Sequence, residues 1–84
     1  MTTYDFTVVL GDQIELTTEM ADRLFAAGCD DGTPSQRSGI VSIGFSREAA
    51  NLETAIRSAI ADVVKAGCVV SRVEIDADAA LLRA

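Results

Sequence analysis

The sequence predicts an α+β domain in which two helices cover one face of an antiparallel sheet. Two observations carry this prediction. Apolar residues recur at helical spacing within 16–27 and 51–67, and they alternate with other residues within 4–10, 39–45 and 68–76. These stretches follow one another as strand, helix, strand, helix and strand, with a polar segment before the second of the three strands.

The stretch 51–67 is the clearest element, and the rest of the domain is expected to pack against it. Asn51 is suited to cap the first turn of this helix, and Gly67 is suited to end it in a left-handed conformation. Its apolar residues have the spacing of one helix face, which must be buried. That face consists of Leu52, Ala55, Ile56, Ala59, Ile60, Val63 and Val64.

The N-terminal part reads as a strand, a loop at 11–13 and a helix. The strand at 4–10 is half-buried, and its aromatic side is expected to face the helices. Thr17 or Thr18 caps the helix, and Gly28 ends it. The buried stripe of this helix is predicted to be Leu16, Met20, Leu24 and Ala27, with Ala21 and Phe25 beside it.

The polar segment CDDGTPSQRSG has the composition of turns. It is interpreted as a short edge strand at 29–33 and a turn at 34–39, with a three-stranded sheet lacking this strand as the alternative. The next strand, 39–45, has Val41, Ile43 and Phe45 on one face, and residues 46–50 lead into the main helix.

The last strand is predicted at 68–76. Its residues Val69, Val73 and Ile75 are expected to face inward, and Val70, Arg72 and Glu74 outward, with Ser71 out of phase. The tail from residue 76 is expected to form one more helical turn or to fray.

The order β-α-β-β-α-β, with two helices that end in the similar sequences AAGC and KAGC, predicts a ferredoxin-like sandwich made by one domain, 1–84. Right-handed crossovers place both helices on one face of the sheet. The first and third strands are then central, and the second and fourth lie at opposite edges.

Composition and charge limit the partners. The net charge is −6, and the seven Lys and Arg residues are scattered, so direct binding of nucleic acid by this segment is not expected. No apolar run reaches the ~18 residues of a membrane span, and the N-terminal residues MTTYDF do not resemble a signal peptide. A cytoplasmic protein without a membrane partner is therefore expected.

The residue types offer little chemistry, and no catalytic residue, cofactor or metal is predicted. Histidine and tryptophan are absent, and no glycine-rich phosphate loop is found. Cys29 and Cys68 each follow a glycine at the end of a helix, where the dipole disfavours a thiolate. They are interpreted as small, partly buried thiols at opposite edges of the sheet, roughly 14 Å apart at ~4.8 Å per strand. Two acidic pairs, Asp30-Asp31 and Asp76 with Asp78, are interpreted as solvated.

The face of the sheet away from the helices is the predicted interface. Its residues are small to medium and lightly charged, so this face either stays in water or packs against a second copy. Contact with a second copy or another partner through an edge strand is the alternative. The predicted interface residues are Thr7, Val9, Ile40, Ser42, Gly44 and Val70.

The segments FSREAANLETAIRSAIADVVKAG, RVEIDAD and AAGCDDGTP resemble a group of small, poorly characterised bacterial α+β proteins. In longer members, a segment of this kind precedes a helix-turn-helix region. The resemblance implies a partner-binding or dimerising module associated with a regulator. No helix-turn-helix region follows in this sequence, and the resemblance implies no site residues.

The sequence thus favours a non-enzymatic interaction or oligomerisation module whose partner is another protein or a second copy, with a homodimer expected. The alternative is a small-ligand sensor, with a pocket between the helices and the sheet or at a subunit boundary near the loop 30–39, where Arg37 and Ser38 would be anion contacts. An enzyme that uses carboxylates or Cys29 is the third hypothesis.

Overall fold

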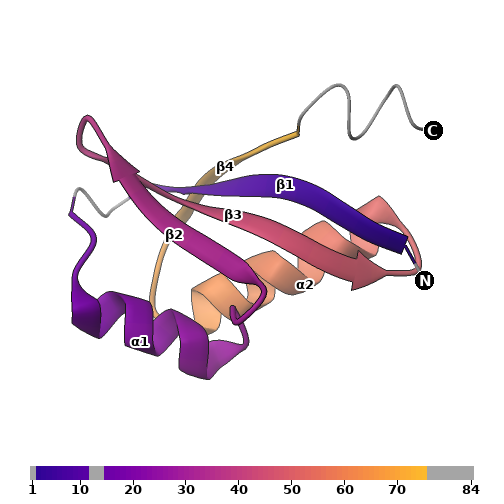
Figure 1. Cartoon of the computed structure of the whole chain (residues 1–84), viewed down its shortest axis with the longest axis horizontal. Coiled ribbons are helices and arrows are strands. Elements are labelled where there is room, and N and C mark those ends of the chain that lie inside the picture. The colour runs from indigo at the N-terminus through magenta and orange to yellow at the C-terminus, as the bar shows by residue number, and fades with distance from the viewer. Residues whose placement is uncertain (1, 12–14, 76–84) are drawn as a thin grey trace.

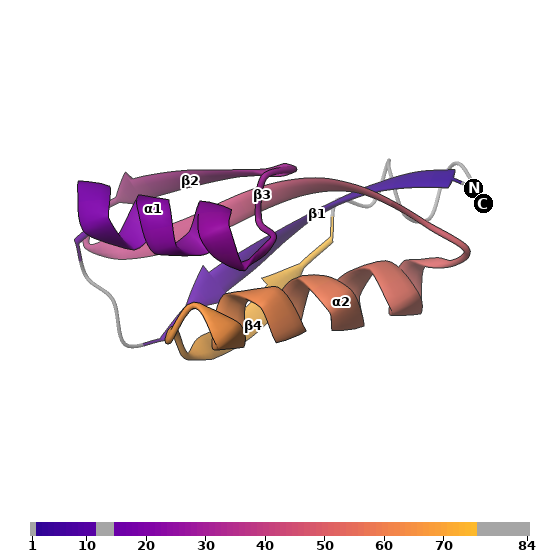
Figure 2. The same ribbon diagram turned by 90° about the horizontal axis from the view of Figure 1, so that it is seen from below.

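The computed structural model of the chain describes residues 2–11 and 15–75. Within them, the elements follow the order β1 (Thr2–Leu10), α1 (Thr18–Ala27), β2 (Gly32–Arg37), β3 (Ile40–Ala49), α2 (Leu52–Lys65) and β4 (Val70–Glu74). The strands form one antiparallel sheet in the order β2-β3-β1-β4, and both helices lie on one side of it (Figures 1 and 2). The predicted ferredoxin-like arrangement is confirmed, with the first and third strands in the centre.

Some sequence predictions fall outside the described residues. They are most of the loop at 11–13, the tail from residue 76, and the acidic pair Asp76 and Asp78.

The helix ends are those that the sequence predicts. The side chain of Thr17 accepts a hydrogen bond from the backbone N–H of Met20, and Gly28 ends α1 with φ 116°. Asn51 accepts from the N–H of Thr54 at the start of α2. Gly67 follows α2 with φ 93°, the left-handed conformation that glycine adopts without steric cost.

The hairpin of β2 and β3 differs from the prediction. β2 starts at Gly32 and continues to Arg37, so Ser38 and Gly39, both with positive φ, are left as the turn. The predicted strand at 29–33 and turn at 34–39 were misplaced, because Pro34 and its polar neighbours suggest a turn although an edge strand tolerates them. β3 also continues beyond the predicted strand, as far as Ala49.

The core lies between the sheet and the helices. Phe6 of β1 and Phe45 of β3 stack there with ring centroids 5.5 Å apart, and alanines on α2 let that helix lie close to the sheet. One residue of the predicted buried face of α2 is not buried, since Val64 is 55% exposed, and Phe25, which was placed beside the stripe of α1, is 68% exposed. The largest fully buried side chains are Phe45, Met20, Leu24, Ile43, Val8, Val41 and Val63.

β4 contains an irregularity that changes which residues face the core. Leu10 pairs with Val70 and Val9 pairs with Arg72, so Ser71 is an extra residue in the ladder. Val70 therefore packs against the core, contrary to its predicted outward orientation. Val69 and Ile75, predicted to face inward, are exposed. From Arg72 to Glu74 the predicted alternation holds, with Val73 packed against the core.

In the part of the chain that the structure describes, neither helix is long and apolar enough to cross a membrane.

Candidate functional site

The open face of the sheet is the side that neither helix covers, above the sheet in Figure 1. Side chains alternate between the two sides of a strand. Every second side chain of β1 and β3 packs into the core, and the side chains between them point to the open face. Pairing between the strands places fourteen residues on this face: Thr3, Asp5, Thr7 and Val9 of β1, Thr33, Ser35 and Arg37 of β2, Ile40, Ser42, Gly44, Ser46 and Glu48 of β3, and Arg72 and Glu74 of β4.

The predicted interface residues lie together on this face, with one exception. The five that share it are Thr7, Val9, Ile40, Ser42 and Gly44. Val70 does not share it, since the extra residue in β4 turns its side chain toward the core beside Leu10. Arg72, which the sequence also predicted to face outward, does lie on this face, where it is paired with Val9.

The middle of the open face is a central row of residues that are paired across the strands. Gly44 is the neighbour of Thr33 on one side and of Thr7 on the other, and Thr7 pairs with Glu74. A Cβ added at Gly44 would have no heavy atom within 4 Å, so the space above this row is open.

Two hollows lie side by side on the open face and share Glu74. Next to the turn, a hollow of about 330 Å³ is lined by Val9, Ser35, Gln36, Arg37, Ile40, Ser42, Arg72 and Glu74. The other, of about 510 Å³, is lined by Asp5, Phe6, Thr7, Thr33, Gly44, Phe45, Ser46 and Glu74. Of the two predicted ligand contacts, Arg37 lines the first hollow, whereas Ser38 lies in the turn and is not part of its lining.

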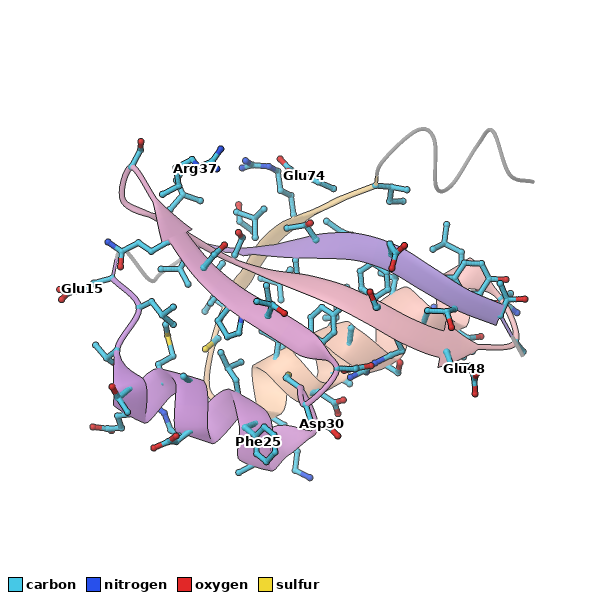
Figure 3. The ribbon with its side chains drawn as sticks, viewed as in Figure 1. Glu15, Phe25, Asp30, Arg37, Glu48 and Glu74 are labelled. Atoms are coloured by element: carbon cyan, nitrogen blue, oxygen red, sulfur yellow. The ribbon has the colours of Figure 1, made fainter. Side chains whose placement is uncertain are left out.

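Charge is divided between the two ends of the open face. Arg37 and Arg72 lie toward the turn between β2 and β3, and Asp5 and Glu48 lie toward the opposite end of the sheet. Figure 3 shows Arg37 and Glu48 at opposite ends of the molecule. Arg72 Nε donates to Glu74 Oε2 at 3.1 Å. Among the described residues, Arg37 has no ion-pair partner.

The strongest polar cluster lies on the other side of the sheet, and its centre is Arg47. This guanidinium lies with its Cζ 5.0 Å from the ring centroid of Phe45. Its Nη1 donates to Ser58 Oγ at 3.1 Å and to Asp62 Oδ2 at 3.0 Å, and its Nη2 donates to the Gly28 carbonyl at 3.0 Å.

The remaining donors of Arg47 bind Asp31. Nε donates to Oδ2 at 2.7 Å and Nη2 to Oδ1 at 2.8 Å, so all five N–H groups of the guanidinium are used. The hydrogen bond to Arg47 lowers the pKa of Asp31, and the hydrogen bond to Asp31 raises the pKa of Arg47. The prediction of two solvated acids was therefore wrong for Asp31, although Asp30 is exposed.

A sequence signal for this cluster existed. The predicted strand ended at residue 45. Had it been continued, the alternation of Val41, Ile43 and Phe45 would have placed the Arg47 side chain on the core side. A buried arginine requires acceptors, and the nearby acids were the candidates. All N–H donors of Arg47 are used within the chain, so its role is to stabilise the fold.

Both cysteines belong to the buried core cluster. Cys29 lies three residues before β2 and Cys68 two residues before β4, so neither begins a strand as predicted, although β2 and β4 are the two edge strands. Cys29 is 4% exposed, and burial raises its pKa to about 11; the nearby carboxylates of Asp62 and Asp31 also raise this pKa, while Arg47 lowers it. A thiol in this state is a poor nucleophile at neutral pH.

Within residues 2–11 and 15–75, no three His, Cys, Asp or Glu side chains are grouped in a way that could hold a metal ion. The open face offers hydroxyl groups, two cations and three carboxylates to a partner, and it lacks an activated nucleophile among the described residues.

Comparison with protein-family models, with curated proteins and with solved structures finds no match to this chain.

Proposed function

We propose that this chain is a non-enzymatic interaction module that forms a homodimer through the open face of its sheet. One observation carries the proposal: the helix-free face has small side chains and open space along its central row, at Gly44 above all. The groups with stronger chemistry, Arg47 and Cys29, are enclosed on the opposite side.

Physical reasons favour contact through such a face. Serine, threonine and glycine permit two sheets to approach to about 10 Å, the usual spacing of stacked sheets. Short side chains also lose less conformational entropy on burial than Lys, Arg or Glu. Their hydroxyl groups can donate and accept, so they can find hydrogen-bond partners across an interface. Ile40, which is 46% exposed, adds apolar area.

The resemblance noted in the sequence extends this proposal. In the longer bacterial proteins, a segment of this kind precedes a DNA-binding region, so the module would serve as an accessory to a regulator. Its partner would be protein in the cytoplasm, with no direct contact to nucleic acid or membrane.

Gly44→Lys tests the proposed contact surface. The new side chain enters open space and leaves the backbone unstrained, so the fold should survive, whereas a second sheet could no longer approach the central row. Light scattering over a range of concentrations should give a dimer mass for the wild type and a monomer mass for the variant. Ala61→Lys, at an exposed position of α2, is the control and should remain dimeric. A wild type that stays monomeric throughout would refute the proposal.

A small-ligand sensor is the second candidate, and the hollow beside Arg37 favours it. Its volume of about 330 Å³ is comparable to the smaller ligand pockets, which begin at about 300 Å³. The exposed guanidinium of Arg37 suits a carboxylate or phosphate. Thermal shift with small carboxylic acids and phosphate esters tests this candidate. A compound that stabilises the wild type but not Arg37→Ala would support it.

A further inference from the structure

The charged residues of the open face are arranged symmetrically about its central row. Arg37 pairs with Ile40, which lies four residues before Gly44 in β3, and Glu48 lies four residues after Gly44. Arg72 pairs with Val9, two residues after Thr7 in β1, and Asp5 lies two residues before Thr7. Each cation therefore has a carboxylate at the same distance on the other side of the row.

The same symmetry relates the strands that carry these residues. Arg37 is in β2 and Glu48 is in the adjacent β3, whereas Arg72 is in β4 and Asp5 is in the adjacent β1. Each cation and its matching carboxylate are thus offset by one strand, about 4.8 Å. An arginine side chain is long enough to cover that offset.

A second copy can face this sheet in two ways that a two-fold axis allows. If the axis runs along the central row, perpendicular to the strands, each strand faces its own equivalent and the two ends of the face are exchanged. Arg37 then lies near the second copy's Glu48, and Arg72 near the second copy's Asp5. Both pairs are formed twice, because the interface is the same from either side.

If the axis instead runs parallel to the strands, each edge strand of one copy faces the opposite edge strand of the other, and the two ends of the open face keep their positions. β2 then faces β4, so Arg37 approaches the second copy's Arg72, and Asp5 approaches its Glu48. Like charges would be brought together at both ends of the interface. Juxtaposed like charges disfavour a binding mode strongly, so the two arrangements differ in electrostatic energy.

We propose that two copies pack face to face with the two-fold axis along the central row, joined by Arg37 to Glu48 and by Arg72 to Asp5 across the interface. This inference rests on the proposed homodimer and adds its orientation. Gly44 and Thr7 of the central row lie at the axis, and so does Glu74, which faces the second copy's Glu74 and is paired with Arg72 of its own chain. Asp5 keeps its hydrogen bond from Ser46 Oγ, at 2.7 Å, as a second support for its orientation.

Charge reversal at Arg37 and Glu48 tests the orientation. Arg37→Glu alone places two acids together, and Glu48→Arg alone places two arginines together. Each single variant should therefore dimerise at least about tenfold more weakly in sedimentation analysis, since each change affects two symmetric pairs. The double variant exchanges the two charges within one chain, and it should recover the wild-type dissociation constant.

Mixing the two single variants is the sharper measurement. In a heterodimer, the glutamate introduced by Arg37→Glu in one chain would meet the arginine introduced by Glu48→Arg in the other. The unchanged Glu48 of the first chain would likewise meet the unchanged Arg37 of the second, so both contacts join opposite charges. Native mass spectrometry should show the heterodimer in excess over both homodimers. Increasing the salt concentration should weaken the wild-type dimer, because the pairs that hold it are screened.

The ion pair of Arg57 and Glu53 on α2 supplies the matched control. Its Nη2 and Oε1 are 3.6 Å apart and both side chains are largely exposed. Arg57→Glu, Glu53→Arg and their double variant change the net charge by the same amounts and should leave dimerisation unchanged. A dimer that Gly44→Lys abolishes but that the Arg37 and Glu48 reversals leave intact would overturn the orientation only. A wild type without any dimer would overturn the proposed function as well.

Discussion

Asp31 and Arg47 form a two-point ion pair, with Nε to Oδ2 at 2.7 Å and Nη2 to Oδ1 at 2.8 Å. It joins the segment between α1 and β2 to the far part of β3, and Asp62 of α2 binds the same guanidinium. The backbone strengthens this junction, because the N–H of Ser46 donates to the carbonyl of Asp31 at 3.2 Å. The guanidinium of Arg47 thus joins α2 and the segment that follows α1 to β3.

Replacing Asp31 by Asn should make stability depend less on pH. The hydrogen bond to Arg47 lowers the pKa of Asp31 below its usual 3.8 in the folded state. Its contribution is therefore present above that pH and is lost as the pH falls through the lowered folded-state value. Urea unfolding at pH 7 should show a loss of about 1–3 kcal/mol for Asp31→Asn, and this loss should shrink below pH 3.8. Asp30→Asn, at the exposed neighbouring acid, is the control and should change stability little at either pH.

Replacing Gly28, Gly39 or Gly44 by alanine should lower the free energy of unfolding by three different amounts. Gly28 has φ 116°, and a Cβ there would lie 2.9 Å from Asp62 Oδ2, so Gly28→Ala should cost about 2 kcal/mol or more. Gly39 has φ 76° with open space around it, and its substitution should cost about 1 kcal/mol. Gly44→Ala, with neither constraint, should change the free energy of unfolding by at most about 0.5 kcal/mol. A different ranking in chemical denaturation would contradict this account of the junction.

Cys29 should be slow to react in the folded protein. Burial raises its pKa from 9.0 to about 11, so the thiolate fraction near pH 8 falls by about 100-fold, and access is also restricted. In a Cys68→Ala variant, a chromogenic disulfide reagent should modify Cys29 promptly in denaturant and far more slowly without it. Equal rates would show that the thiol is not enclosed.

The same pKa shift predicts alkaline sensitivity. The unfolded thiol ionises at about 9.0 and the folded one at about 11, so the unfolded state loses its proton first. Stability should therefore decline as the pH rises between these values, and Cys29→Ala should reduce that part of the decline. An identical pH dependence in the variant would contradict the assignment to Cys29.

Substitution of Val70 in β4 and of Val64 in α2 tests which way these side chains face. Val70 packs against the core beside Leu10, so Val70→Lys should lower the free energy of unfolding by about 1–2 kcal/mol. Val64 is 55% exposed, so Val64→Lys should change it by about 0.5 kcal/mol or less. Thermal or urea unfolding of both variants measures the contrast. Equal losses would place both side chains in similar surroundings.

Much of the fold could be predicted because its signals are local. The caps at Thr17 and Asn51 and the glycines that end both helices act within one helical turn. Alternation in β1 and β3 likewise assigns residues to faces without knowledge of their partners. Five of the six proposed interface residues were placed on the open face by this reasoning.

The predictions that failed depend on contacts between segments that are distant in the chain. Ser71 is an extra residue only with respect to β1, so the orientation of Val70 depends on pairing with a strand about sixty residues earlier in the chain. Arg47 has its acceptors on two separate segments, the connection between α1 and β2 and the helix α2, and no local pattern says which acids will reach it.

The sequence by itself determined the order of the elements, the ends of the helices and the face to which most strand residues belong, because helical and strand periodicity and capping act between near neighbours. Only the tertiary structure decided that Val70 faces inward, that Asp31 neutralises Arg47, and that Arg37 and Glu48 lie equally far from the central row. Those relationships arise from the register of strands and from contacts between segments distant in the chain, which side-chain spacing along one segment does not specify.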